Sequence, residues 1–384
     1  MTTATDPLLA WREEFPILAR KTYLVNHSLG AMPRSAASSL QAYADDWSTQ
    51  GIEAWDVWFP MITEVGDRIG RILNAPAGAI IMHQNVSTLQ SIVASCFDFS
   101  GRKNKVVYEA MNFTTVHYLW QQQTRLGARV HLVGSPDGIH VPTETMLAAI
   151  DDETLVVPIS HVLFQSNYLQ DAKAIVEKAH RHGAYVVLDT YQSAGIVPVD
   201  VQDLGVDFVV GGSVKWLCGG PGAAYLYVRP DLVSQFQPRQ TGWLSHAHPF
   251  DFTMDMDYAE NTMRFLGGSP GMAGLYAARE GYRIIHEVGV SAIRAKSLRQ
   301  TRLLMSLAEE AGLTIKNPRD DARRGGTVCL DFEGSGPASK ELIRRGFQVD
   351  HRPQCGIRVS PHFYNTDDEL HAFMEELKRV RAGR

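Results

Sequence analysis

The fold is indicated most clearly by the stretch AYVVLDTYQSAGIVPVDVQDLGVDFVVGGSVKWLCGGPGAAYLYV, residues 184–228. It contains three short apolar runs, AYVVLD, DFVVGG and AAYLYV, which are separated by turns rich in glycine and serine. Strands buried on both faces have continuous apolar runs, whereas half-exposed strands alternate polar and apolar residues. The stretch therefore predicts three buried strands of one sheet, with the more polar residues gathered at the strand ends.

The same pattern extends toward the N-terminus. Further apolar runs occur at 80–82, 105–109, 128–133 and 154–160. Candidate helices lie between the runs, near 87–98, 114–126, 143–150 and 170–182. Strands that alternate with helices are typical of an α/β fold with helices on both faces of a parallel sheet. We therefore expect a mostly parallel seven-stranded sheet that binds its ligand beyond the carboxyl ends of the strands.

The two ends of the chain differ from this central region. After about residue 290 the pattern predicts helices near 291–311, 337–346 and 366–382 and short strands near 313–316, 327–333 and 357–360. This mixture indicates a small C-terminal α+β domain. We expect an N-terminal segment (1–70) that packs on the large domain or on a neighbouring subunit, a large domain (71–285) and a small domain (286–384).

Composition argues against several classes of protein. The 384 residues are 45% hydrophobic, enough to bury one large core and a smaller one. The net charge is −5, and no basic stretch with interleaved aromatic residues predicts a nucleic-acid partner. No run of 18 apolar residues predicts a membrane span, and no basic and apolar leader predicts export. We therefore expect a cytoplasmic protein without nucleic-acid or membrane partners.

Cysteine and histidine spacing predicts neither disulfides nor a metal site. The four cysteines, Cys96, Cys218, Cys329 and Cys355, lie far apart and form no CxxC pair, which favours reduced thiols. The pairs His180/His182 and His246/His248 lack a third ligand at a recognisable spacing. We expect no metal.

Two charged residues stand at strand ends in the deciding stretch. Asp189 ends one apolar run, and Lys215 follows another in the loop GGSVKWLCGGPG. Taken singly, such residues are more often caps or solvated charges. Together they match the needs of pyridoxal 5'-phosphate (PLP), which requires a lysine for a Schiff base and a carboxylate that keeps the pyridine nitrogen protonated. Burial in the apolar loop would lower the pKa of Lys215 toward the neutral amine.

This segment resembles the core of class V PLP-dependent enzymes of the aminotransferase-like group, which have the fold-type I transferase fold. The group holds kynureninases, cysteine desulfurases and lyases, and isopenicillin-epimerase-like proteins. The run GGSVKWLCGGPG is most similar to kynureninase-like sequences. The similarity extends from YLVNHSLG, residues 23–30, to RVSPHFYN, residues 358–365. It implies PLP as the cofactor, an L-amino acid as the substrate, and a homodimer with shared active sites.

The resemblance also implies which residues contact the cofactor. The phosphate would lie at a helix N-terminus, where N–H groups and hydroxyls favour an anion. The implied contacts are Ser87, Thr88 and Ser213 at the phosphate, Gln192 at the phenolic oxygen, Phe113 on the pyridine ring, and Trp243 and Ser269 from a neighbouring subunit. Without the resemblance, the serines and threonine are ordinary caps and Phe113 is a core aromatic.

Three further residues are implied in substrate binding. Arg358 would grip the α-carboxylate, because its planar guanidinium can form two parallel hydrogen bonds. Asn26 and His27 would approach the substrate side chain.

The chain departs from both of its nearest subfamilies. Val214 stands where kynureninases have a tyrosine that supports proton transfer, Gln192 where they have a histidine, and Val116 where they have an aspartate. Desulfurases need a mobile nucleophilic cysteine, and the nearest candidate, Cys355, is predicted to be structural.

We predict a PLP-dependent hydrolase or lyase that performs kynureninase-type hydrolytic Cβ–Cγ cleavage, giving alanine and an aromatic acid. Lys215 would remove the Cα proton, and Asp189 would stabilise the protonated pyridine. A cysteine or selenocysteine C–S lyase, a desulfurase-like enzyme, an aminotransferase or an epimerase would share this first step. The space bounded by Phe113, Trp243 and His27 should discriminate among them, according to whether it admits an aromatic ring.

Two readings outside this chemistry lack sequence support. A nucleotide-dependent oxidoreductase needs G-x-G-x-x-G after a first strand, and the only glycine-dense loop follows a late strand. A PLP-binding regulator would usually carry a DNA-binding module, for which the chain leaves no room.

Overall fold

A seven-stranded sheet forms the centre of the computed structural model, which describes residues 6–383. Its strands are β2 (Ile80–His83), β3 (Lys105–Glu109), β4 (Arg129–Val133), β5 (Thr154–Ser160), β6 (Tyr185–Asp189), β7 (Phe208–Gly212) and β8 (Ala224–Val228). The order is β2-β8-β7-β6-β5-β3-β4. β8 is antiparallel to both neighbours, and the other pairings are parallel. The mostly parallel seven-stranded sheet is confirmed.

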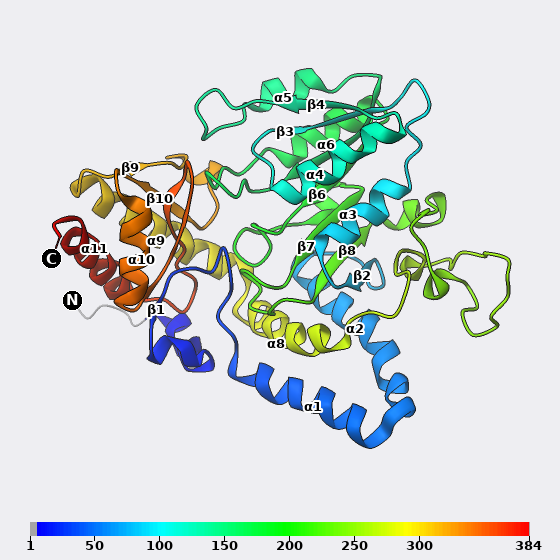
Figure 1. The fold of residues 1–384 in the computed structure, drawn as a ribbon, viewed down its shortest axis with the longest axis horizontal. Coiled ribbons are helices and arrows are strands. Elements are labelled where there is room, and N and C mark those ends of the chain that lie inside the picture. Colours follow the sequence, from blue (N-terminus) through cyan, green and yellow to red (C-terminus); the bar gives the residue numbers. More distant parts are fainter. Residues whose placement is uncertain (1–5, 384) are drawn as a thin grey trace.

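Helices pack against this sheet (Figure 1). α2 (Trp55–Leu73) contacts β2, α3 (Val86–Ser95) contacts β7 and β8, and α6 (Ala172–Arg181) contacts β5 and β6. The remaining helices of this region are α1 (Arg34–Gln50), α4 (Thr114–Gln122), α5 (Thr143–Ala149), α7 (Val201–Leu204) and α8 (Met272–Val288). α1 packs along α8, and neither helix was predicted. Among the described residues, no helix is long and apolar enough to cross a membrane.

A second, smaller sheet lies in the C-terminal part of the chain (Figure 1). Its order is β12-β13-β10-β9, formed by β12 (Asp350–Arg352), β13 (Gly356–Val359), β10 (Val328–Asp331) and β9 (Thr314–Ile315). The helices of this part are α9 (Val290–Glu310), α10 (Ser335–Arg344) and α11 (Asp367–Arg381). Its buried side chains form their own hydrophobic cluster. The small α+β domain is thus confirmed, while its boundary at 285/286, which falls inside α8, stays a prediction.

The N-terminal segment contacts both parts. It begins with two short 3₁₀ helices, Pro7–Glu14 and Pro16–Ala19. β1 (Thr22–Tyr23) then pairs in parallel with β11 (Phe347–Gln348) of the small domain. Further along, α2 packs on the large sheet. The segment therefore joins the two domains as well as covering the large one.

His362 ties the small domain to the loop that carries Lys215. Its Nε2 donates to the Trp216 carbonyl oxygen at 2.9 Å, and the two rings meet edge to face at 5.4 Å. Burial lowers the pKa of His362 to about 3. The ring is therefore neutral and holds the loop by a single donated hydrogen bond.

We expect His362 to make the free energy of unfolding depend on pH. An unfolded histidine has a pKa of about 6.5, so between that value and the folded pKa the unfolded chain binds the proton and the folded chain does not. The stability is complete above about pH 6.5 and falls as the pH drops, by about 2 kcal/mol at pH 5. Urea unfolding of His362→Gln at pH 7 and pH 5 should lose this part of the dependence. The exposed His371→Gln is the control, and equal pH dependence in all three proteins would contradict the expectation.

Candidate active site

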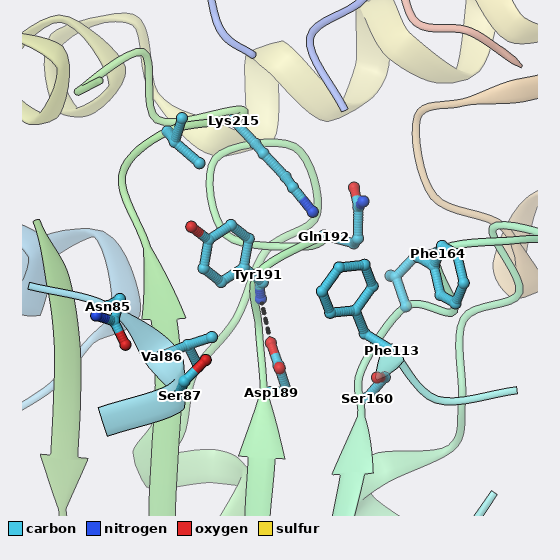
Figure 2. Close-up of a pocket in the computed structure, with 12 residues that line it drawn as sticks. Asn85, Val86, Ser87, Phe113, Ser160, Phe164, Asp189, Tyr191, Gln192 and Lys215 are labelled. Atoms are coloured by element: carbon cyan, nitrogen blue, oxygen red, sulfur yellow. Dashed lines mark hydrogen bonds between the residues drawn. The ribbon is translucent and has the colours of Figure 1, made fainter. Parts of the chain in front are cut away.

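A cavity of about 280 Å³ lies beyond the carboxyl ends of β5, β6 and β7 (Figure 2). Its lining residues are Asn85, Val86, Ser87, Phe113, Ser160, Val162, Phe164, Asp189, Tyr191, Gln192, Val214 and Lys215. Parallel strands end at one edge of a sheet, so the residues that follow them meet there. Five predicted site residues therefore line one cavity: Lys215, Asp189, Gln192, Phe113 and Ser87.

The Lys215 amine reaches into this cavity without a hydrogen bond or ion pair to any described residue. Nζ lies 4.5 Å from the centroid of the Tyr191 ring and 5.7 Å from that of Phe113. Burial lowers the pKa of Lys215, and the charge of Arg358 adds to this, while Asp189 opposes it. A neutral lysine amine is nucleophilic toward an aldehyde. The geometry therefore suits covalent attachment of a carbonyl cofactor.

Asp189 points into the cavity from the end of β6 (Figure 2). Its Oδ1 accepts the Tyr191 backbone N–H at 2.8 Å. Burial raises the pKa of Asp189, while the Tyr191 N–H and Lys215 lower it. A buried carboxylate with few partners favours a cationic ligand group. A protonated pyridine nitrogen is such a group, so the Lys215 and Asp189 side chains fit the two ends of a PLP ring.

The N-terminus of α3 forms another wall. Asn85 caps this helix, because its Oδ1 accepts the Thr88 N–H at 2.9 Å and the Thr88 hydroxyl at 3.1 Å. Thr88 is thus engaged in the cap and does not line the cavity, whereas Ser87 does. The first N–H groups of a helix lack intrahelical partners and attract anions. This wall suits the phosphate, with Ser87 rather than Thr88 facing it.

Ser213 and Gln192 both have partners within the protein. The Ser213 hydroxyl pairs with the Tyr282 hydroxyl at 2.5 Å, and Ser213 does not line the cavity. Gln192 lines it, while its Nε2 donates to the His27 carbonyl at 3.1 Å and its Oε1 accepts from Trp216 at 3.3 Å. An amide nitrogen has two N–H groups, so Gln192 retains one for a ligand.

Arg358 is buried next to the cavity residue Phe164 but does not line the cavity, and Asp350, which the sequence did not point to, holds it in place. Its Nε and Nη2 donate to the two oxygens of Asp350 at 2.8 and 2.6 Å, and its Nη1 donates to the Phe164 carbonyl at 3.0 Å. Hydrogen bonds from His27 and Arg358 hold the pKa of Asp350 well below its usual range, although burial alone would raise it. Three of the five guanidinium N–H groups are thus used within the protein.

Asn26 and His27 do not line the cavity. The Asn26 side chain donates to the Ser360 carbonyl at 2.9 Å and accepts from the Tyr364 hydroxyl. His27 Nε2 contacts Asp350 at 2.8 Å, and its Nδ1 contacts the Ser360 hydroxyl. Burial lowers the pKa of His27 to about 4. Both residues join the N-terminal segment to the small domain.

Trp243 and Ser269 also lie outside the cavity, on neighbouring segments. Leu244 donates its N–H to the Gly267 carbonyl at 2.9 Å, which places the two segments side by side. Trp243 is 40% exposed, and Ser269 is exposed as well. Their predicted contact with a neighbouring subunit stays a prediction.

Tyr191 and Phe164 are among the cavity residues that sequence reasoning missed. Tyr191 had a local signal, because it stands between the strand-end Asp189 and Gln192. Phe164 had none, since it lies in an irregular loop after β5. Its ring meets that of Phe113 edge to face, with centroids 5.2 Å apart.

Comparisons with known proteins agree with this geometry. Residues 59–373 match the model of the family described as aminotransferase class-V. The Bacillus subtilis protein described as uncharacterized aminotransferase YcbU is 30% identical and covers 96% of both chains. A kynureninase from Geobacillus thermodenitrificans is 28% identical, over 98% of this chain and 92% of its own.

Solved structures show the same fold. The apo cysteine desulfurase from Thermococcus onnurineus NA1 matches all of both chains, with a TM-score of 0.88 and 20% identity. A variant of C-DES with glycine covalently linked to its PLP cofactor covers 96% of this chain and 98% of its own, with a TM-score of 0.87 and 18% identity. With the family model spanning most of its length, the chain belongs to the aminotransferase class-V family of fold-type I enzymes, whose cofactor is pyridoxal 5'-phosphate.

Proposed function

We propose that this PLP-dependent enzyme hydrolyses the Cβ–Cγ bond of an L-amino acid that carries an aromatic ketone, as a kynureninase does. The observation that carries the proposal is the aromatic wall formed by Phe113 and Phe164, on the side of the cavity opposite the α3 N-terminus (Figure 2). Trp243 and His27 do not bound this space, contrary to expectation. Phe164 bounds this space instead of Trp243 and His27, and its ring offers a surface for an aromatic substrate.

The remaining chemistry is divided among three side chains. Bound PLP supplies an electron sink for the substrate α-carbon. Asp189, at the end of β6, pairs its carboxylate with the protonated pyridine nitrogen. Lys215, whose pKa is lowered by burial, is the base that removes the Cα proton. Arg358 binds the α-carboxylate through the N–H groups that Asp350 and Phe164 leave free.

A C–S lyase is the second candidate, because Gln192 occupies the cavity position at which kynureninases have a histidine. A desulfurase that passes sulfur to its own cysteine is less well supported. Cys355 is only 1% exposed, and burial raises the pKa of its thiol to about 11. No cysteine among residues 6–383 lines the cavity.

We also propose a homodimer with shared active sites. Exposure of Trp243 and Ser269 on adjoining segments supports this assembly.

The reaction can be identified with a panel of substrates. We expect L-kynurenine or 3-hydroxykynurenine to give anthranilate or its hydroxy form together with alanine, because the aromatic wall accepts the ring. Cysteine and alanine are the comparison substrates, and product assays should detect anthranilate, sulfide and pyruvate. Sulfide or pyruvate without anthranilate would move the assignment to the C–S lyase.

Lys215→Ala should lose the covalent link to the cofactor, because alanine has no amine to form the Schiff base. The wild-type protein is expected to absorb at about 420 nm and to retain PLP covalently after borohydride reduction. Mass spectrometry of the reduced variant should show no added cofactor. An unchanged absorption band in the variant would contradict the role of Lys215.

Arg358→Lys should raise the KM for the amino acid by about 10- to 100-fold, because an ammonium cannot form two parallel hydrogen bonds. Arg352→Lys is the matched control, since Arg352 contacts the same Asp350 oxygen at 3.1 Å but is partly exposed. Steady-state kinetics and the cofactor spectrum of both variants provide the measurement. A similar KM in the two variants would argue against carboxylate binding by Arg358.

A further inference from the structure

Tyr191 is a half-buried cavity residue whose hydroxyl has no hydrogen bond to any described residue. Two other tyrosine hydroxyls nearby do have hydrogen-bonding partners. The Tyr225 hydroxyl pairs with Thr190 at 2.8 Å, and the Tyr282 hydroxyl pairs with Ser213 at 2.5 Å. Those two residues are fully buried, and polar groups in protein interiors are usually paired, whereas Tyr191 is only half-buried and lines the cavity. The Tyr191 hydroxyl is therefore open to a partner within the cavity.

The chain makes room for this ring at the end of β7. A Cβ atom on Gly212 would lie 2.4 Å from Cε2, 2.6 Å from Cζ and 2.7 Å from the hydroxyl oxygen of Tyr191. Gly212 does not have a positive φ, so space rather than backbone conformation accounts for the glycine. The Tyr191 hydroxyl thus lies against the strand end that leads to Lys215.

The residues between that strand end and Lys215 offer the cavity no hydroxyl of their own. Gly212 has no side chain, Ser213 pairs with Tyr282, and Val214 is apolar. Figure 2 shows the Tyr191 ring between Lys215 and the Asn85–Ser87 turn, with its hydroxyl on the side away from the Lys215 amine. That side of the cavity holds the α3 N-terminus, where an anion is favoured.

We propose that Tyr191 is a cofactor-binding residue whose hydroxyl donates a hydrogen bond to the phosphate of PLP, in the role expected of Ser213. Burial raises the pKa of Tyr191 to about 12, so the hydroxyl keeps its proton at neutral pH. The ring also packs beside the Lys215 amine, 4.5 Å from Nζ, which keeps the lysine extended into the cavity. The inference rests on PLP binding in this cavity and not on the reaction proposed above.

The test compares PLP with pyridoxal, which lacks the phosphate, in equilibrium binding to the apoprotein. Tyr191→Phe keeps the ring and removes only the hydroxyl. We expect its PLP dissociation constant to rise about tenfold, the size of one hydrogen bond to a charged group, while pyridoxal binding stays unchanged. Inorganic phosphate should also compete less well with PLP for the variant than for the wild type.

Tyr225→Phe is the matched control, because it removes a buried hydroxyl that is already paired and does not line the cavity. Its PLP and pyridoxal affinities should both equal those of the wild type, and circular dichroism should show both variants folded. Unchanged PLP affinity in Tyr191→Phe, or equal weakening of PLP and pyridoxal, would overturn the proposal. Since no turnover is measured, a failure of the kynureninase assignment would leave this result intact.

Discussion

The rest of the site depends on burying the Lys215 amine without a hydrogen-bonding partner. Removing an ammonium from water is costly, so burial shifts the lysine toward its neutral form. Asp189 lies in the same cavity and suffers the opposite shift, because burial disfavours its carboxylate. Burial thus disfavours the charged form of each group. A cationic ring beside Asp189 and an aldehyde at Lys215 would remove this cost. The cavity therefore matches the charges of PLP before the cofactor binds.

This arrangement is held by contacts from all three parts of the chain. The sheet places Asp189 and the Lys215 loop at neighbouring strand ends. His362 of the small domain donates to the Trp216 carbonyl, directly after the lysine. The N-terminal segment supplies the His27 carbonyl oxygen, which accepts a hydrogen bond from the Gln192 side chain. Movement of the small domain or of the N-terminal segment would therefore displace the Lys215 loop or Gln192 at the cofactor site.

The sequence predicted the sheet well, because buried parallel strands are continuous apolar runs that need no tertiary information. It also located the residues that follow strands directly, such as Asp189 and Gln192, since strand ends converge. It could not show which of these side chains are held by distant partners within the protein. Ser213 is turned away by Tyr282 of α8, and Arg358 is held by Asp350. Helices α1 and α8, which pack along each other, were not predicted from the sequence.

The pairing of β1 with β11 has a consequence for the order of events during synthesis. The N-terminal segment leaves the ribosome well before the residues that it contacts, because Arg12 and its acceptor, the Tyr364 carbonyl, are 352 residues apart. At 5–20 residues per second, these partners emerge roughly 20 to 70 seconds apart. The large domain can fold in that interval, whereas the segment at residues 7–25 has to wait. Synthesis of the small domain therefore determines when the N-terminal segment can pack in its final position.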